Sequence, residues 1–217
     1  MGLPTLPRGT LTFEHFSHMM TVFSPYLIIA YLTTMLSADL QFAKKMFKHL
    51  SETDEMTGLM NRRSFSNVIT SEHNKSVRYN HTYSILMIDA DGLKMINDEH
   101  GHEAGDKLIT TLAETIKNCL RESDSLARYG GDEFVALLPE TNKQQAEDAG
   151  ERIRKAVENT SFDMQGKLVK ATVSIGVSSY PVDTDNADGA LIKADRALYK
   201  SKHEGGNQVC STVESDQ

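Results

Sequence analysis

The sequence Arg128-Tyr129-Gly130-Gly131-Asp132-Glu133-Phe134 decides how this chain folds. It joins two stretches with the composition of strands, Ser125–Tyr129 and Phe134–Leu138. A Gly-Gly pair between such stretches predicts a β-hairpin with a two-residue turn, because glycine adopts positive φ without steric cost. The two acidic residues behind the turn suit a place where backbone meets phosphate and carboxylate meets metal. An ordinary polar hairpin tip has the same composition, and the hairpin alone favours that simpler interpretation.

A second acidic cluster follows the apolar stretch Tyr83–Asp89, which predicts a buried strand that ends in a carboxylate. Asp91 lies two residues beyond Asp89, and we expect the two carboxylates to point to opposite sides if the strand continues. Mg2+ prefers oxygen ligands and often shares them between one or two carboxylates and substrate phosphates. The cluster therefore predicts a site for a hard divalent cation. A polar turn at a strand end explains one of these aspartates well and two less well.

Six motifs occur in an order that resembles the GGDEF-domain family of diguanylate cyclases. The resemblance runs from Asp54 to Asn207 and covers most of the chain. The Gly-Gly-Asp-Glu-Phe motif alone is moderately specific, whereas the ordered set is strongly so. The motifs are residues 54–63 (DEMTGLMNRR), 89–98 (DADGLKMIND), 101–106 (GHEAGD), 130–134 (GGDEF), 172–177 (TVSIGV) and 194–202 (ADRALYKSK).

Helical and strand patterns alternate along this part of the chain, which predicts an α/β (α+β) fold with a sheet covered by helices. The resemblance implies the palm-like sheet of nucleotidyl cyclases, with the hairpin at its centre. The expected helices are 61–72, 103–121, 143–158 and 187–203, the last of which is ended by Gly205 and Gly206. The expected strands are 83–89, the hairpin 125–138, and 168–179 after a turn at 165–166.

The resemblance implies a reaction in which two GTP molecules condense into cyclic di-GMP and two pyrophosphates. Asp89, Asp132 and the backbone carbonyl of Ala90 are then the ligands of Mg2+ or Mn2+. Glu133 is a second metal ligand or a general acid or base, and Asp132 is a candidate proton acceptor. Carboxylates that share a metal titrate together, so which of them takes the proton stays open.

The resemblance also implies a set of substrate-binding residues. Asn97 and Asp106 would hydrogen-bond the guanine edge, and Asp106 favours GTP over ATP because adenine lacks the paired donors of guanine. The other members are His102 in a substrate loop, Lys94 and Lys202 on the triphosphate, and Gly130 and Gly131, which let the backbone approach the nucleotide.

One position departs from the family's pattern. Gly205-Gly206-Asn207 stands where the family usually has Gly-Arg-Asn, so a phosphate-binding cation is missing at Gly206. Losing one charge-assisted hydrogen bond typically costs about 1.5–3 kcal/mol, which would lower the affinity for nucleotide. The alternative to an active cyclase is a catalytically weak domain that binds cyclic di-GMP or GTP. The signature acids and glycines are all present, which favours the enzyme.

Arg121 and Asp124 precede the signature at the spacing of the family's product-inhibition site. Arginine clamps phosphate and stacks on guanine, and aspartate accepts hydrogen bonds from a guanine edge. Arg152 resembles the second arginine of that site. The resemblance therefore implies inhibition by bound cyclic di-GMP. The plain structural alternative is a helix-terminal arginine beside an aspartate that forms a turn.

The composition limits the class of protein. The 217 residues, 39% hydrophobic and 24% charged, suit one folded domain with an appendage. A net charge of −7 and the lack of a basic stripe with aromatic residues argue against a nucleic-acid partner. Cys119 and Cys210 lie far apart in the sequence, which suits a reducing compartment.

The N-terminal part has a different character. Residues 1–18 form a short segment, and residues 19–38 carry no charge and have the length of about 20 residues that a spanning helix needs. Lysines follow this stretch, which would place the catalytic domain in the cytoplasm at the inner membrane. The alternative is a soluble cytoplasmic protein whose helix is buried in a dimer or against another domain.

Residues 39–53 are expected to continue as a linker helix. Five apolar positions repeat at intervals of 4, 3, 4 and 3, the coiled-coil pattern: Leu36, Leu40, Ala43, Phe47 and Leu50. A parallel homodimer would bring two cyclase domains together, each with one GTP. The cyclase domain then spans residues 54–209, and residues 210–217 form a flexible tail.

Overall fold

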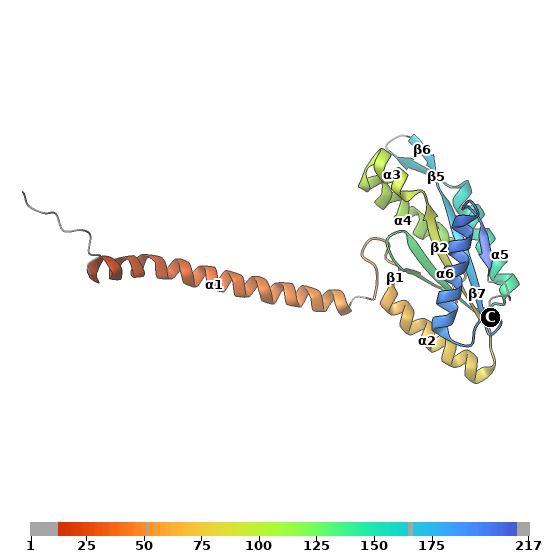
Figure 1. Cartoon of the computed structure of the whole chain (residues 1–217), viewed down its shortest axis with the longest axis horizontal. Helices are drawn as coiled ribbons and strands as arrows, with labels where there is room; N and C mark the ends of the chain where they lie inside the picture. Colours follow the sequence, from red (N-terminus) through yellow and green to blue (C-terminus); the bar gives the residue numbers. More distant parts are fainter. Residues whose placement is uncertain (1–12, 51, 165–166, 212–217) are drawn as a thin grey trace, which may run out of the picture. The chain divides into compact units, whose positions relative to one another are not determined.

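The computed structural model describes residues 13–50, 52–164 and 167–211, and the chain divides into two compact units (Figure 1). The first unit is residues 1–51, and its described part is one helix, α1 (Phe13–Leu50). The second unit is residues 52–217, and it holds the remaining helices and the strands.

Helix α1 exposes its apolar side chains. Leu36 and Leu40, at two of the coiled-coil positions, are 68% and 70% exposed. The side chains of residues 45–50 lie outside the described part, so the coiled-coil seam stays a prediction. The stretch His15–Lys44 contains an 18-residue window with a mean hydropathy of 1.5, and it could cross a membrane by length and composition, a property it shares with signal sequences and some soluble helices.

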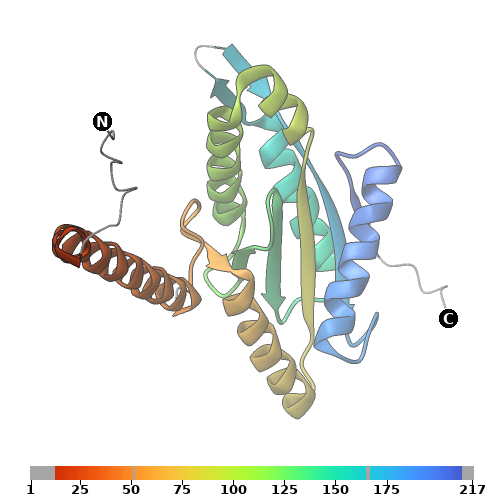
Figure 2. The ribbon, with the colours of Figure 1, turned by 60° about the vertical axis from the view of Figure 1, so that its left-hand side comes forward.

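A six-stranded mixed sheet forms the centre of the second unit. Its order is β1 (Met60–Asn61), β3 (Ser125–Arg128), β4 (Glu133–Pro139), β2 (Tyr83–Asp91), β7 (Thr172–Tyr180) and β8 (Val209–Ser211). Strand β2 pairs antiparallel with both β4 and β7, while the two outermost strands pair parallel with their neighbours. Figure 2 shows the β3–β4 hairpin between β1 and β2. A separate two-stranded sheet consists of β5 (Ser161–Met164) and β6 (Lys167–Lys170).

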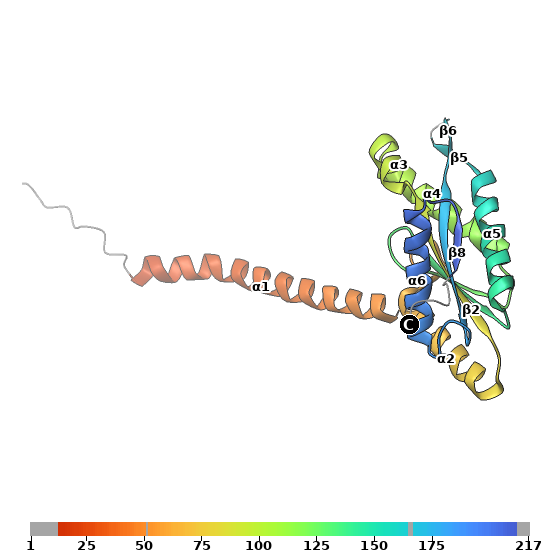
Figure 3. The same cartoon turned by 45° about the vertical axis from the view of Figure 1, so that its right-hand side comes forward.

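Helices cover both faces of the sheet, with α5 and α6 on opposite sides (Figure 3). The helices are α2 (Arg62–Tyr79), α3 (Leu93–His100), α4 (His102–Cys119), α5 (Lys143–Asn159) and α6 (Ala187–His203). Alternate residues of β2 divide between two cores: Leu86 and Ile88 pack with α4 and α5, and Ile85 and Met87 with α2 and α6. Burial on both faces explains why β2 is a continuous apolar run instead of an alternating one.

The structure confirms the expected fold class and corrects several elements. Helix α2 continues to Tyr79 and ends at Asn80, whose φ of 56° closes it. Helix α3 was not predicted, and the expected strand 168–179 is two strands, β6 and β7. The turn predicted at residues 165–166 lies outside the described residues, as do residues 212–217 of the predicted tail.

The hairpin is present, but its turn differs from the prediction. Strand β3 ends at Arg128 and β4 begins at Glu133, so residues 129–132, here named the signature turn, connect them. Neither Gly130 nor Gly131 has positive φ, so the prediction of a two-residue turn with left-handed glycines is wrong. The N–H groups of Tyr129 and Gly130 close this longer turn on the carbonyl of Glu133, at 2.8 and 3.4 Å. The added length removes the need for left-handed residues.

Candidate functional site

Asp89 lies near the end of β2, where only 5% of the residue is exposed. Strand pairing places Asp89 directly opposite Glu133 on β4. The backbone N–H of Ala90 donates to the carbonyl of Asp132 at 3.3 Å, which ties the signature turn to the end of β2. Residues directly opposite each other in an antiparallel pair share one face of the sheet. The hairpin register therefore brings the two predicted acidic clusters to one place.

Lys202 on α6 neutralises Asp89. Its Nζ atom forms an ion pair with Asp89 Oδ1, at 2.5 Å. The pKa of Asp89 is raised to about 6, mainly by burial and also by the nearby charges of Asp132 and Glu133, while the contact with Lys202 acts to lower it. Such a carboxylate is stabilised in its charged form by any cation that comes near it.

The donor set fits a hard divalent cation in part. No group of three or more His, Cys, Asp and Glu side chains in the described part of the chain is arranged to hold a metal. Asp89 nevertheless offers a buried carboxylate, whose Oδ1 atom is ion-paired with Lys202, and Asp132 and Glu133 lie close enough to raise its pKa. Mg2+ usually takes only one or two carboxylates and fills its shell with water and phosphate oxygens. Three neighbouring carboxylates are therefore a sufficient donor set for a metal that arrives with a nucleotide.

Asp91 has a different role from Asp89. The prediction that the two point to opposite sides is wrong, because β2 continues through Asp91 and residues two apart in a strand share a face. Asp91 accepts hydrogen bonds from Thr172 Oγ1 at 2.8 Å, from Ser174 Oγ at 2.7 Å and from the N–H of Asn207 at 3.0 Å. It therefore holds the loop after α6 against β7. The spacing of Thr172 and Ser174 on one strand face was the available signal for this role.

A cavity of about 290 Å³ lies beside Asp89, at the end of α6. Its lining includes one cation, Lys202, and one carboxylate, Asp91, together with the backbone at Ala90, Gly92 and Gly206. Gly92 has a φ of 76° and immediately precedes helix α3. An ammonium group and a helix N-terminus both favour anions. Of the two lysines predicted to bind triphosphate, the structure places Lys202 here, while Lys94 is exposed on α3.

Helices α3 and α4 bring the two predicted guanine-binding residues together. The Oδ1 atom of Asn97 is buried without a hydrogen-bond partner among the described residues. It lies so close to Gly105 that a Cβ atom on that residue would clash with it. Asp106 is the next residue on α4 and is exposed, as is His102 at the start of that helix. An unpartnered amide oxygen beside an exposed carboxylate is suited to reading a polar edge, and these roles stay predictions.

The predicted product site lies between α4 and β3. Arg121 and Asp124 belong to one tight turn: the N–H of Arg121 donates to Asp124 Oδ2 at 2.7 Å, and the N–H of Asp124 donates to the Arg121 carbonyl at 3.0 Å. Arg152 on α5 donates from Nε and Nη2 to the carbonyl of Cys119, at 3.2 and 3.0 Å. The structure thus joins Arg121 to Asp124 and holds Arg152 at the end of α4.

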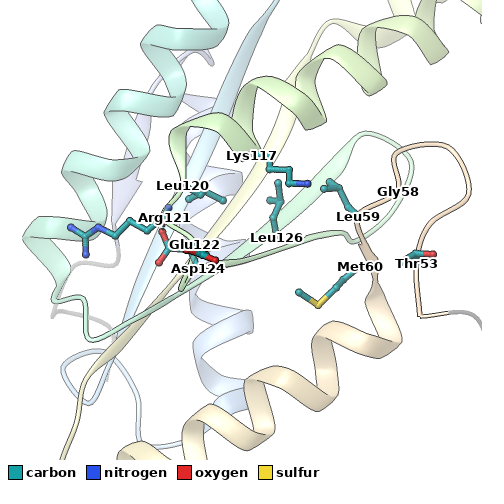
Figure 4. A pocket seen from close by; sticks show the side chains of 10 residues that line it. All are labelled: Thr53, Gly58, Leu59, Met60, Lys117, Leu120, Arg121, Glu122, Asp124 and Leu126. Carbon is teal, nitrogen blue, oxygen red and sulfur yellow. Dashed lines mark hydrogen bonds between the residues drawn. The ribbon is translucent and has the colours of Figure 1, made fainter.

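A second cavity, of about 420 Å³, adjoins this turn (Figure 4). Leu59 and Met60 line one side, and Arg121 and Asp124 belong to its lining on the other. In Figure 4 the guanidinium of Arg121 extends away from Leu59 and Met60. The remaining lining residues are Thr53, Gly58, Lys117, Leu120, Glu122 and Leu126.

Comparison with known proteins identifies the class. Residues 51–208 match the family model described as diguanylate cyclase, GGDEF domain. The match covers most of the chain, and the chain belongs to the GGDEF-domain family. The sheet with helices on both faces matches that of solved GGDEF domains.

Two similar proteins are diguanylate cyclases. Diguanylate cyclase A of Treponema denticola is 44% identical over 164 residues, which cover 74% of this chain and 44% of that protein. Diguanylate cyclase DgcM of Escherichia coli K12 is 37% identical over 166 residues, which cover 76% of this chain and 40% of that protein. The matched part is thus less than half the length of either relative.

Solved structures give the same result. The GGDEF domain of DgcB from Caulobacter crescentus, in complex with c-di-GMP, has a TM-score of 0.70 at 28% identity and covers 74% of this chain and 95% of that one. Diguanylate cyclase SiaD from Pseudomonas aeruginosa, in complex with its activator SiaC, has a TM-score of 0.71 at 29% identity and covers 92% of this chain and 75% of that one.

Proposed function

We propose that this protein condenses two GTP molecules into cyclic di-GMP and two pyrophosphates. The observation that carries the proposal is the convergence of Asp89 with Asp132 and Glu133 next to Lys202, which also lines a neighbouring cavity. Membership of the GGDEF family and the named activity of the two relatives support it.

Asp89, the Ala90 carbonyl and Asp132 would hold Mg2+ or Mn2+, with Glu133 as a further ligand. The bound metal would lower the pKa of a ribose 3′-hydroxyl and neutralise charge at the α-phosphate. Lys202 and Lys94 bind the phosphates as point charges, and Asp132 or Glu133 accepts the hydroxyl proton. Asn97 and Asp106 hold the guanine edge, and His102 contacts the substrate from the start of α4. Gly130 and Gly131 have no side chains, so the nucleotide can approach the backbone of the signature turn.

The test is to incubate the purified chain with GTP and Mg2+ and to identify the product by mass spectrometry. Asp89→Asn should lower the rate by about 100-fold or more, because charge stabilisation in the transition state is lost. Asp195→Asn, an exposed aspartate on α6, is the matched control and should keep full activity. Full activity of folded Asp89→Asn at saturating Mg2+ would contradict the metal assignment.

The absent cation at Gly206 favours one alternative, a catalytically weak domain that binds GTP or cyclic di-GMP. Isothermal titration with each nucleotide separates the two functions. Binding without any cyclic di-GMP formed would establish the binding module in place of the enzyme.

Inhibition by the product would act through Arg121, Asp124 and Arg152. Arg121→Ala should relieve inhibition by cyclic di-GMP while the initial rate stays nearly intact, because the turn lies across β3 from the catalytic acids. An initial rate that falls together with inhibition would refute a separate regulatory site.

The reaction joins two nucleotides, so two domains have to face each other in a homodimer, with helix α1 as the shared seam and its apolar stretch in the inner membrane. Replacing Leu36 and Leu40 by aspartate should weaken self-association in analytical ultracentrifugation and lower the specific activity at dilute concentration. Membrane fractionation of the full chain tests the second part. Recovery of the unmodified protein only in the soluble fraction would leave the soluble cytoplasmic alternative.

A further inference from the structure

Arg128, at the end of β3, connects two segments that are far apart in the sequence. Its Nε and Nη2 atoms donate to the carbonyl of Gly131, at 3.0 and 2.7 Å. Its Nη1 atom donates to both carboxylate oxygens of Asp54, at 3.2 and 3.3 Å. Only 14% of the Arg128 side chain and 24% of the Asp54 side chain are exposed. One guanidinium group therefore holds the signature turn on one side and residue 54 on the other.

Asp54 belongs to a closed turn of residues 54–59, here named the N-terminal turn. Its Oδ1 atom accepts from the N–H and from the hydroxyl of Thr57, at 2.9 and 2.8 Å. Its backbone N–H donates to the Leu59 carbonyl at 2.8 Å, and its carbonyl accepts from the N–H of Gly58 at 2.9 Å. Burial alone would raise the pKa of Asp54, but the hydrogen bonds from Thr57 and Arg128 hold it below its usual value. The Asp54 carboxylate is thus charged at neutral pH, and both of its oxygens accept hydrogen bonds.

Two further contacts join the same segments. Strand β1, which follows the N-terminal turn, pairs parallel with β3, and Asn61 lies opposite Arg128. The guanidinium of Arg62 lies over the ring of Tyr129, 4.5 Å from its centroid. Cation–π contacts at this distance are attractive. Both residues that lead into the signature turn are therefore held by the N-terminal edge of the domain.

The signature turn carries Asp132, whose carbonyl accepts from the N–H of Ala90 on β2 at 3.3 Å. The orientation of the turn decides where its two carboxylates lie relative to Asp89. Two N–H groups of Arg128 converge on the one carbonyl oxygen of Gly131, the residue next to Asp132, and a lysine could not reproduce that planar fork. The planar guanidinium therefore restricts the turn in direction as well as in distance.

We propose that Arg128 is a positioning residue that acts through the Gly131 carbonyl, and that Asp54 fixes Arg128 in turn. The N-terminal turn follows residues 52–53, directly behind helix α1 in the chain, so the clamp makes the geometry of the catalytic turn depend on the segment through which α1 is attached. The turnover test of this role rests on the proposed function, whereas the exchange test does not.

The first measurement is hydrogen–deuterium exchange, which needs no enzyme activity. Asp54→Asn keeps the size and part of the Thr57 bonding but removes the charge facing Arg128. Exchange at the amides of Tyr129 and Gly130, which close on the Glu133 carbonyl, should become at least tenfold faster. Arg78→Lys, an exposed change on α2, is the matched control and should leave those amides unchanged. Unchanged exchange at Tyr129 and Gly130 in Asp54→Asn overturns the coupling, whether or not the protein is a cyclase.

The second measurement is steady-state turnover of GTP. Arg128→Lys should lower kcat at least tenfold and leave KM for GTP within about threefold, since the turn is displaced while the guanine and phosphate contacts remain. The double variant with Asp54→Asn should lose little more than Arg128→Lys alone, because both changes break one clamp. An additive loss, or a loss of kcat that matches the loss of folded protein, overturns the positioning role.

Discussion

Two glycine pairs adjoin the acidic site, and they are glycine for different reasons. Gly205 and Gly206 have φ values of 115° and 72°, in a region that other residues rarely adopt. Gly130 and Gly131 have ordinary φ values, but a Cβ atom on Gly130 would lie 2.9 Å from Glu133 Oε2. The first pair thus serves the backbone conformation of a loop, whereas in the second pair Gly130 leaves room for a carboxylate. A Gly-Gly pair thus meets a conformational requirement in the loop after α6 and a steric requirement in the signature turn.

Among the glycine variants, the largest effect on turnover is expected for Gly130→Ala. The added methyl group displaces the end of the flexible Glu133 side chain, so folding changes little while the acid moves. We expect kcat to fall by about tenfold or more, which corresponds to roughly 1.4 kcal/mol in the transition state. Turnover and the melting temperature should be measured together. A lowered melting temperature with normal kcat would reverse the assignment of this glycine.

An effect on stability, instead of turnover, is expected for Gly206→Ala. A left-handed residue other than glycine costs about 1–2 kcal/mol, which lowers the melting temperature by roughly 2–8 °C in a domain of this size. Gly206→Arg restores the family's usual residue with the same strain. Its KM for GTP should therefore be lower than that of Gly206→Ala. Equal KM values in the two variants would show that the cation does not explain nucleotide affinity here.

The smallest effect on stability is expected for Gly131→Ala. No atom lies within 4 Å of the added Cβ and φ is not positive, so the free energy of unfolding should change by less than about 0.5 kcal/mol. Thermal unfolding of this variant beside Gly206→Ala compares the two pairs directly. Similar losses in both would mean that the signature turn needs left-handed glycine after all, and the contrast would fail.

The sequence predicted the elements that local pattern decides. Helix α6 has the expected bounds, and α5 and the hairpin differ by only a residue or so, because apolar periodicity and capping define them. Helix α3 was missed because it begins after Gly92 without a side-chain cap. Strands β1 and β8 were missed because such short edge strands depend on pairing with distant partners.

The acidic site was predicted in its residues but not in its geometry. Motif order placed Asp89 and the signature acids together, and the β2–β4 register agrees. No local pattern could reveal the contact of Arg128 with Asp54, which lies 74 residues away, or that of Lys202 with Asp89. Contacts of this kind depend on how whole helices and strands pack, so they cannot be predicted from the spacing of residues in the sequence.

Strand β2 has neighbours on both edges and apolar cores on both faces, and Asp89 is part of it. A strand enclosed in this way separates only when the whole domain unfolds cooperatively. The free energy needed to open the site at Asp89 therefore approaches that of unfolding the whole domain, and a partly unfolded domain would lack the site. Metal-bound nucleotide that binds at Asp89 is linked to global unfolding, and it should raise the melting temperature of the entire domain by mass action.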